Sequence, residues 1–420
     1  MSAARGELLV IGGGLVGLAC AVRLQEAGWP TMVVDREDPV PAASLGNAGH
    51  IALEQAEPLA SPATVRSAVR RHFAFGGALD LPLGKIRTWG PWALRFLAAA
   101  TPARFAAGKR VLGGLMAEAG PAWRRLANDI GAERLYAESG HIVVWGSAQA
   151  AETGRAAWAG ADIGTASFGD LEAEALDRLG ARLKARPAGG IRFRGTGRIH
   201  DLPALHQRLR TAVTERGGVL LKGEATRLVF ENGRVRVVLA DGTRLAPELV
   251  LIAAGARSGR LMAGAGHKAP VIAERGYHLH DPDADWPEDL APLVFEDRSL
   301  IVNRFRDGLR CSSFVEFARP ETPPDPRKWA RLRRHAAELG LPFGPEAREW
   351  MGARPTLPDY LPAIGRSRRA SNLAYAFGHQ HLGLTLAAVT GDLVAAMLSG
   401  RDPAVDLGPF DVERFNSSAN

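Results

Sequence analysis

Short apolar runs that end in small residues dominate the hydropathy pattern at the start of this chain. Leu8–Ile11 is a continuous apolar run of the kind found in buried parallel strands. It leads into a glycine-rich turn at residues 12–14, and residues 18–24 continue with helical character. Gly28 is placed to end that helix, and a second apolar run covers residues 31–34. The pattern predicts a strand–helix–strand unit with buried strands.

The middle of the chain changes its pattern twice. Residues 65–187 are predicted to be largely helical, with one strand at residues 140–145. Leucine and valine at helical spacing then predict a helix over residues 202–216. Short apolar runs follow between residues 218 and 242, and the Asn-Gly and Asp-Gly turns that join them predict a small hairpin sheet.

The last part of the chain combines both types of strand. Residues 249–255 form an apolar run that ends in small residues, and this run predicts a parallel strand beside the first one. Residues 269–317 are predicted to form antiparallel strands. From Met351 onward we expect the chain to return to the N-terminal domain and to close with a long helix, whose buried stripe begins at Leu386.

The glycines of the first turn carry the most specific chemical signal. Gly12, Gly14 and Gly17 have the spacing of the dinucleotide-binding fingerprint, in which one glycine allows a tight turn and the next lets a pyrophosphate approach. Asp35 follows the second strand, near the distance expected of the acid that binds an adenosine ribose. An acid there favours a free 2′-hydroxyl, and therefore FAD or NAD over NADP.

Composition narrows the class of protein. A chain of 420 residues, 46% of them hydrophobic, is long enough for two domains. No run reaches the roughly 18 apolar residues that cross a bilayer, and the first apolar run does not have the pattern of a signal peptide. The net charge is +7, but no basic run is interleaved with aromatic residues, so we expect no nucleic acid partner. Cys20 and Cys311 lack metal or redox spacing and are expected to be packing residues.

Several separated segments together resemble one enzyme family. Besides the fingerprint, they are residues 44–49 (SLGNAG), 352–359 (GARPTLPD) and 378–385 (GHQHLGLT). In their order and spacing these segments resemble the FAD-dependent D-amino-acid dehydrogenase and oxidase superfamily, with the closest likeness to bacterial D-amino-acid dehydrogenases. The resemblance covers essentially the whole chain. It implies an α/β fold, in which a Rossmann-like FAD-binding domain is joined to a discontinuous α+β substrate domain built on an antiparallel sheet.

The changes of pattern give the expected domain boundaries. The FAD-binding domain is expected to comprise residues 1–84, 191–268 and 346–420. The substrate domain is expected to comprise residues 85–190 and 269–345. The chain would therefore pass repeatedly between the two domains, and a site between them would be built from segments that are distant in sequence.

The resemblance implies one FAD, held without a covalent bond because no cysteine lies near Arg354. Its expected binding residues lie in the fingerprint, at the ends of two strands, in the segment 44–49 and in the late loop before the terminal helix. They are Gly12, Gly14, Leu15, Val16, Gly17, Asp35, Arg36, Ser44, Asn47, Ala48, Gly49, Ala254, Gly255, Gly378, His381, Leu382, Gly383, Leu384 and Thr385. In many dehydrogenase relatives the late loop reads Gly-His-Gly-Thr, and here Gln380 and His381 replace the last two residues. We expect no metal, because His379 and His381 have no third ligand at typical spacing.

Arg354 is the expected substrate-binding residue. Its guanidinium can hold a carboxylate through two parallel hydrogen bonds, and the resemblance places it over the flavin. The resemblance also gives the phenol of Tyr277 a contact with that carboxylate. His379 and His50 complete the predicted catalytic residues, with a structural role for His50 left open. The implied reaction is hydride transfer from Cα of a D-amino acid to FAD, which gives an imine and then a 2-oxo acid.

The acceptor and the location stay open at this point. We expect electrons to pass to a quinone or an electron-transfer protein of the respiratory chain, as in dehydrogenase relatives. The alternatives are a D-hydroxyproline dehydrogenase that gives a cyclic imine, a glycine- or sarcosine-type oxidase that uses oxygen, and an FAD-binding subunit of a larger assembly. Residues 85–97 combine tryptophan with basic residues, so peripheral membrane contact is an alternative to packing on the substrate domain. We expect a cytoplasmic protein, with contact at the cytoplasmic face of the inner membrane left open.

Overall fold

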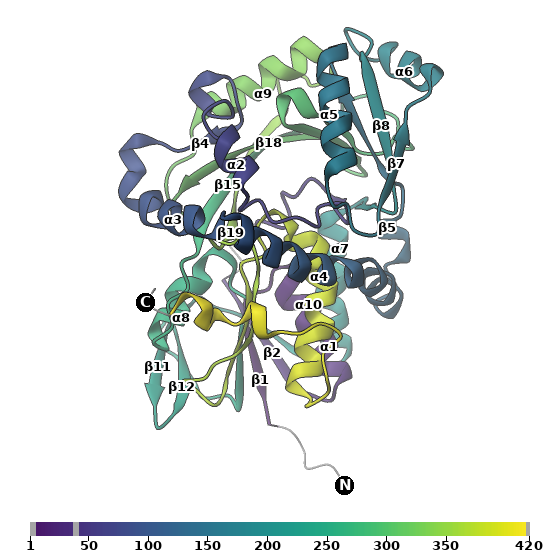
Figure 1. Cartoon of the computed structure of the whole chain (residues 1–420). Helices are drawn as coiled ribbons and strands as arrows, with labels where there is room; N and C mark the ends of the chain where they lie inside the picture. Colours follow the sequence, from purple (N-terminus) through teal and green to yellow (C-terminus); the bar gives the residue numbers. More distant parts are fainter. Residues whose placement is uncertain (1–5, 37–41, 417–420) are drawn as a thin grey trace.

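Two sheets organise the chain in the computed structural model, which describes residues 6–36 and 42–416 (Figure 1). The smaller sheet has six strands, and its neighbouring strands are parallel except for the last pair. In spatial order they are β10 (Val219–Lys222), β2 (Thr31–Asp35), β1 (Leu8–Ile11), β14 (Leu249–Ile252), β21 (Leu373–Phe377) and β20 (Ala363–Arg366). The predicted parallel neighbours of the first strand are confirmed, because β1 pairs with both β2 and β14.

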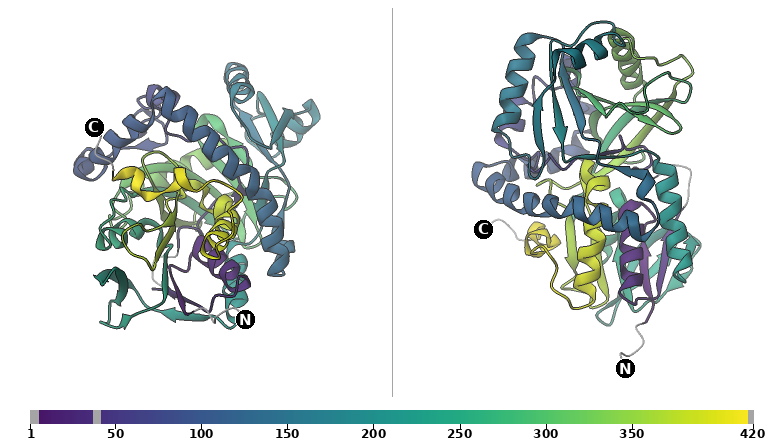
Figure 2. Two further views of the ribbon diagram at one scale, coloured as in Figure 1. Left: turned by 60° about the horizontal axis from the view of Figure 1, so that its bottom comes forward. Right: turned by 90° about the vertical axis from the view of Figure 1, so that its right-hand side faces the viewer.

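Helices cover one face of the six-stranded sheet. Helix α1 (Leu15–Glu26) packs against α10 (Gly383–Leu398) and α7 (Leu202–Glu215). The long helix α4 (Pro102–Asp129) packs on α10 and lies across the junction of the two halves of the molecule (Figure 2). Within the described ranges, residues Gln380–Leu398 are the one helical segment long and apolar enough to cross a membrane, but most of that segment is buried in this core.

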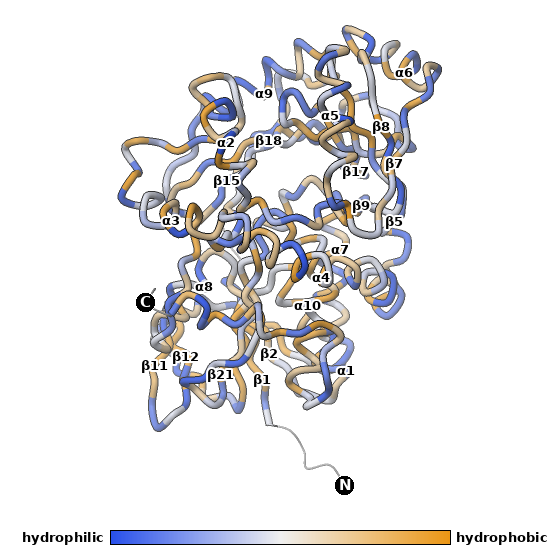
Figure 3. The backbone as a smooth tube through the Cα atoms, in the orientation of Figure 1, coloured by the Kyte–Doolittle hydropathy of each residue, from blue (hydrophilic) through white to orange (hydrophobic). Residues whose placement is uncertain are grey.

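The opposite face of the six-stranded sheet is covered by a small hairpin sheet. Its strands are β11 (Ala225–Glu231), β12 (Arg234–Leu239) and β13 (Arg244–Leu245), and α8 (Ser258–Gly264) packs beside them. Apolar residues follow β1 and β21 through the interior, while the tips of β11 and β12 are hydrophilic (Figure 3). The predicted hairpin sheet is confirmed for β11 to β13, and it closes a second hydrophobic core. The apolar run at residues 218–221 was wrongly assigned to it, because β10 pairs in parallel with β2 of the six-stranded sheet.

The larger sheet has nine strands and is mostly antiparallel. Eight of them follow the spatial order β19 (Arg348–Thr356), β15 (Ile272–Asp281), β18 (Gly308–Ala318), β17 (Leu300–Phe305), β16 (Leu293–Phe295), β6 (His141–Trp145), β8 (Gly189–Arg194) and β7 (Ser167–Asp170). The short strand β4 (Leu79–Asp80) pairs with β18. A parallel sheet packed with helices beside a largely antiparallel sheet is the fold class that the sequence predicted.

The remaining elements surround the larger sheet and the junction. Helices α5 (Ala148–Gly160) and α6 (Ala173–Gly180) lie at one end of that sheet, and α9 (Pro326–Leu339) packs on β15 and β18. Helices α2 (Pro62–Ser67) and α3 (Ile86–Ala99) lie at the other side of the molecule in Figure 1. A fourth sheet joins β3 (His50–Ile51), β9 (Gly197–Ile199) and β5 (Tyr136–Ala137).

The prediction from the sequence placed strand β19 in the wrong sheet. We expected the chain to return to the N-terminal domain from Met351 onward, but β19 pairs along its whole length with β15 of the larger sheet. The return to the smaller sheet begins only with β20 at Ala363. A strand joins the sheet that offers it a partner, and that partner lies far away in sequence, so local pattern alone does not decide the matter.

Candidate active site

A cavity of about 1160 Å³ reaches from the first glycine turn to strands β15 and β19. All four predicted catalytic residues line it, namely His50, Tyr277, His379 and Arg354. So do most of the predicted cofactor-binding residues: Gly12, Gly14, Leu15, Val16, Asp35, Arg36, Ser44, Asn47, Ala48, Ala254, Gly255, His381, Gly383 and Leu384. The others, Gly17, Gly49, Gly378, Leu382 and Thr385, do not line it. Segments far apart in sequence are thus brought to one space.

The turn after β1 has the close backbone approaches that the fingerprint requires. Gly12 has a φ of +114°, and a Cβ on it would lie 2.4 Å from the carbonyl oxygen of Ala253. A Cβ on Gly17 would lie 1.9 Å from the carbonyl oxygen of Gly12, so glycine at this position lets α1 pack closely against the turn. A Cβ on Gly14 would touch little, because that backbone is open toward the cavity. The backbone N–H of Gly13 donates to the carboxylate of Asp35, which sets that acid beside the turn.

The segment 44–49 is fastened to the larger sheet by buried polar side chains. Arg310 of β18 donates to the carbonyl oxygens of Leu45 (3.1 Å) and Asn47 (2.6 Å). Asn303 of β17 donates to that of Ala48 over 2.9 Å. Burial lowers the pKa of Arg310 to about 10, so its guanidinium is still positively charged at neutral pH. These bonds hold a small-residue wall against the cavity, which suits close contact with a planar ring.

The late loop is held by two neutral histidines. His379 Nε2 lies 2.9 Å from Thr390 Oγ1, and His381 Nε2 lies 2.6 Å from Gln55 Oε1. Burial lowers the pKa of His379 to about 3 and that of His381 to about 4. The loop leads into α10, whose first residue, Gly383, lines the cavity, so the positive end of that helix faces the cavity. The residues present therefore fit an FAD whose phosphates meet the first turn and whose ring meets this loop.

Arg354 is positioned by a carboxylate directly opposite it in the sheet. Strands β15 and β19 place Glu274 across from Arg354, and Arg354 Nη1 lies 3.1 Å from Glu274 Oε1. The side chain of Glu274 is 1% exposed, while that of Arg354 is 28% exposed. A Cβ on Gly276 would lie 2.2 Å from Arg354 Nη2, so the guanidinium occupies the space that this glycine leaves. Glu274 therefore holds one edge of the guanidinium, and Arg354 also lines the cavity.

Glu274 is itself held at both oxygens. Its Oε2 accepts hydrogen bonds from Thr356 Oγ1 (3.0 Å) and from the hydroxyl of Tyr360 (3.1 Å). A buried carboxylate is stable only when its oxygens are paired in this way. The arrangement fixes the guanidinium before any substrate arrives, which is the condition for orienting a bound carboxylate.

Three residues with strained backbone conformations surround this pair. Phe314 has a φ of +67°, Tyr360 one of +57° and Gln380 one of +50°, in the left-handed region that favours glycine. The carbonyl oxygen of Phe314 lies 3.4 Å from Arg354 Nη1, and that of Tyr360 accepts a 2.5 Å hydrogen bond from Gln380 Nε2. Phe314 lies in a β-bulge, where the pairing of β15 with β18 skips a residue. Strain of this kind gathers at functional sites.

The structure places Tyr277 differently from the prediction. Successive side chains of a strand point to opposite faces, so Tyr277 points away from the face that carries Glu274. Its hydroxyl donates to Glu316 and accepts hydrogen bonds from Arg275 Nη2 (3.1 Å) and the backbone N–H of Asp325 (3.2 Å). The side chain is buried in this network, which leaves the predicted contact with a substrate carboxylate without support in the geometry.

Several residues of the cavity wall belong to none of the predicted motifs. Glu274 stands two positions before Gly276, but Arg275, His278, His280 and Asp281 are polar residues of the same strand, so no local signal distinguishes this acid. Glu54 lies next to the predicted segment and pairs with His50, whose Nε2 is 3.0 Å from Glu54 Oε1. Arg71 also lines the cavity, and its side chain makes no hydrogen bond or ion pair with any described residue, although its backbone bonds to Ser67 and Leu79. Its charge, like that of Arg354, acts on the hydroxyl of Tyr360.

Comparisons with known proteins agree on one family. The profile of the DAO family, described as FAD dependent oxidoreductase, matches residues 7–397. A D-amino-acid oxidase of Bradyrhizobium diazoefficiens is 30% identical, with 97% of this chain and 99% of that protein covered. A D-amino acid dehydrogenase of the same organism is 28% identical over the same shares of both chains.

Solved structures show the same fold at lower identity. The glycine oxidase of Geobacillus kaustophilus matches with a TM-score of 0.71 at 21% identity, covering 98% of this chain and 99% of that chain. The iminodiacetate oxidase of Chelativorans sp. BNC1 matches with a TM-score of 0.70 at 19% identity, covering 96% and 98%. Both similarities extend over both sheets, and at these identities they show a common fold and nothing more specific.

Proposed function

Because the chain belongs to the DAO family of FAD-dependent oxidoreductases and its cofactor is therefore FAD, we propose that it oxidises a D-amino acid at Cα. The product is an imine, which water converts to a 2-oxo acid and ammonia. The similar curated proteins named D-amino-acid oxidase and D-amino acid dehydrogenase support this substrate class. The observation that carries the proposal is the guanidinium of Arg354, held by buried Glu274 at the wall of the cavity.

The residues of the chain supply binding and orientation. When bound, FAD supplies the acceptor for the hydride that leaves Cα. Arg354 binds the substrate carboxylate through charge-assisted hydrogen bonds, and Glu274 keeps the guanidinium from turning. The N-terminus of α10 and the late loop offer backbone N–H groups where negative charge grows. Fixing the carboxylate in this way also fixes the direction of the Cα–H bond.

A substrate screen tests this proposal. The purified enzyme is supplied with D- and L-amino acids, glycine, sarcosine and both hydroxyproline epimers, and reduction of a dye acceptor is followed. We expect turnover with D-amino acids and none with the L-enantiomers. Because Arg71 adds an unpaired positive charge to the cavity wall, acidic D-amino acids should be preferred over basic ones. Turnover of only the L-enantiomers, or of no amino acid, would contradict the proposal.

We propose that the electrons leave to a quinone or an electron-transfer protein, with noncovalent FAD. Neither Cys20 nor Cys311 lines the cavity, and both are buried, which supports a noncovalent cofactor. The name of the relative at 30% identity supports oxygen as the alternative acceptor. Peroxide formation per substrate oxidised separates the two, because a dehydrogenase yields little peroxide in air while an oxidase yields one equivalent. Acid precipitation should release the flavin into solution.

We also propose that the enzyme binds peripherally to an anionic membrane surface through residues 62–104, at the cytoplasmic face. Of the eight large hydrophobic residues exposed in the described part of the chain, six lie in this segment: Val69, Phe75, Leu83, Ile86, Leu94 and Leu97. The segment has seven basic residues and one acid, Asp80, which is buried and paired with Lys328. Exposed apolar and basic side chains together favour anionic lipid. Hydrophilic and hydrophobic residues are interspersed around α3 (Figure 3).

Vesicle sedimentation tests the membrane proposal. The wild-type protein should sediment with phosphatidylglycerol vesicles and not with phosphatidylcholine vesicles, and salt should weaken the binding. The double variant Leu94→Glu, Leu97→Glu should lose binding but keep dye-linked activity. A matched control, Val219→Glu with Phe230→Glu, changes two exposed apolar residues outside the segment and should bind normally. Equal binding by both double variants would contradict the proposal.

A further inference from the structure

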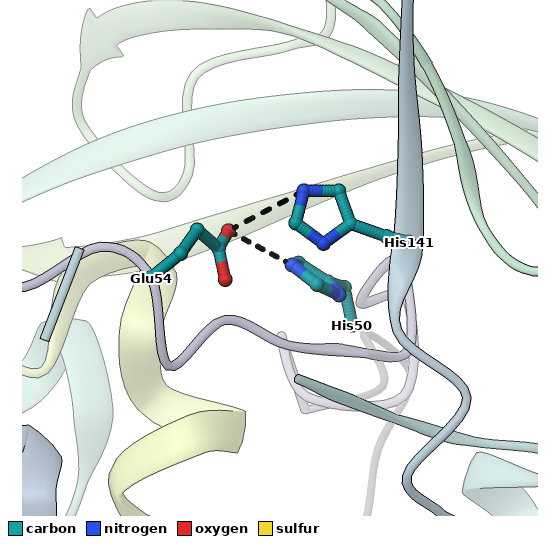
Figure 4. A group of neighbouring side chains, drawn as sticks. All are labelled: His50, Glu54 and His141. Carbon is teal, nitrogen blue, oxygen red and sulfur yellow. Dashed lines mark hydrogen bonds and ion pairs between the residues drawn. The ribbon is translucent and has the colours of Figure 1, made fainter. Parts of the chain in front are cut away.

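A buried cluster of two histidines and one glutamate adjoins the cavity (Figure 4). His50 Nε2 lies 3.0 Å from Glu54 Oε1, and His141 Nε2 lies 3.9 Å from the same oxygen. The two imidazole rings meet edge to face with centroids 4.4 Å apart. The side chains of Glu54 and His141 are each 2% exposed. His50 and Glu54 line the cavity, whereas His141 does not and contacts the ring of His50.

The cluster has the arrangement of a histidine activated by a carboxylate. Burial by itself raises the pKa of Glu54, but nearby His50 and His141 outweigh it and lower that pKa to about 2. A carboxylate that accepts the Nε2–H of His50 leaves Nδ1 of the ring as the proton-accepting atom. That Nδ1 is buried and has no hydrogen-bond partner among the described residues. An orphaned acceptor of this kind costs free energy unless a ligand donates to it.

The other charged and titratable groups around His50 do not compete for this role. Burial lowers the pKa of His141 to about 3, and its ring is stacked on Phe193 and bonded to Thr196 Oγ1 over 3.1 Å. Arg198 pairs with His50 through the backbone, but its guanidinium donates to the carbonyl oxygens of residues 288 and 290. Glu54 is thus the only described charged side chain bonded to His50.

The cluster and the carboxylate-binding pair flank the same space. The charges of Glu274, Arg354 and Glu54 all act on the imidazole of His381. His381 also lines the cavity and is bonded to Gln55, the residue after Glu54. A small amino acid whose carboxylate meets Arg354 therefore has the Glu54 cluster among its neighbours.

We propose that His50, supported by Glu54, takes a proton from the ammonium group of the bound amino acid. This inference rests on the proposed function, since the substrate it concerns is a D-amino acid. At neutral pH an amino acid carries an ammonium group, and its nitrogen has no free electron pair to assist loss of hydride from Cα. In the proposed step an N–H bond of the substrate breaks and an Nδ1–H bond forms. The amine becomes neutral, and the imidazolium is stabilised by the carboxylate of Glu54. Glu54 is a positioning residue here.

The pH dependence of flavin reduction tests this proposal. His50→Gln and the wild type are mixed anaerobically with a D-amino acid between pH 6 and pH 10, and the rate of flavin bleaching is measured. Near pH 7 the variant should be slower by roughly 10²-fold, the range of general base catalysis. The difference should shrink steadily toward high pH, because the substrate amine then loses its proton in solution. Glu54→Gln should show the same pattern with a smaller loss.

Other outcomes distinguish the alternatives. A loss that is equal at every pH, or no loss at all, would overturn the proposal, because a merely structural role does not depend on the substrate's protonation. FAD content and melting temperature of both variants show whether they fold. A stoichiometric divalent cation in the wild type, absent in Glu54→Gln, would instead assign the same three side chains to a metal. Failure of the wild type with every D-amino acid would contradict the proposed function itself.

Discussion

At the scale of residues, the site depends on how one guanidinium is kept in place. Arg354 was found from its motif, but its partner Glu274 lies 80 residues earlier and meets it only through sheet pairing. The sequence did contain the reason why Tyr277 points elsewhere. It adjoins Gly276, the residue against which Arg354 lies, and neighbouring side chains of a strand face opposite ways. Local motif and alternation together therefore predict more than either alone.

Removing the charge of Glu274 tests the role assigned to it. In Glu274→Gln the ion pair with Arg354 is lost, and a charge-assisted hydrogen bond is worth about 1.5–3 kcal/mol. We expect KM for the D-amino acid to rise by about tenfold, while kcat changes less. Thr356→Val is the matched control, because it removes one neutral hydrogen bond to the same carboxylate and should change KM less. Unchanged KM in Glu274→Gln would show that Arg354 needs no support.

At the scale of elements, the loop between β21 and α10 shows what this chain's departure from the Gly-His-Gly-Thr pattern costs. Gln380 stands where many dehydrogenase relatives carry glycine, and its φ of +50° is one that glycine adopts without strain. Its amide compensates by donating to the carbonyl oxygen of Tyr360. The departure is visible in the sequence, but its cost is visible only in the backbone conformation.

Two variants of Gln380 separate strain from hydrogen bonding. Both Gln380→Ala and Gln380→Gly lose the amide, but only glycine relieves the left-handed conformation, which costs other residues about 1 kcal/mol or more. We expect Gln380→Gly to be more stable than Gln380→Ala by about 1 kcal/mol in urea unfolding of the holoenzyme. This is the reverse of the usual order of these residues inside an element. The usual order, with alanine more stable, would contradict the strain assigned to this loop.

At the scale of the whole molecule, the cavity lies where the two sheets meet, and buried neutral histidines surround it. The first strands, the glycine turn and the fold class followed from sequence because apolar runs and glycine spacing are local signals. The sheet joined by β19 and the cluster of His50, Glu54 and His141 did not, because they arise from contacts between distant segments. Contacts between distant segments leave no local pattern in the sequence, and this is why these two features could not be predicted.

The buried histidines make stability depend on pH in a definite direction. The pKa of His379 in the fold is about 3 and that of His381 about 4, both below the usual value of 6.5. Below pH 6.5 the unfolded chain therefore binds protons that the folded chain does not. The contribution of these two histidines to the free energy of unfolding is fully present above this pH. It is lost as the pH falls, by up to about 1.4 kcal/mol per pH unit for each histidine.

Urea unfolding with saturating FAD at pH 7, 6 and 5 measures this effect. The free energy of unfolding should fall on acidification, and it should fall less steeply in His381→Gln, which lacks one of these groups. Identical slopes in the two proteins would show that His381 is not held neutral by the fold.

In the proposed site a flavin lies within reach of a substrate whose carboxylate Arg354 holds, and anaerobic reduction of Arg354→Ala is the decisive test of this arrangement. We predict that the variant purifies yellow with a full complement of FAD, since Arg354 lies apart from the glycine turn. We predict also that D-amino acids bleach the wild-type flavin, while the variant is bleached only at far higher substrate concentrations. Bleaching of the variant at the wild-type concentration and rate, or a wild-type protein that takes up no flavin, would contradict this account.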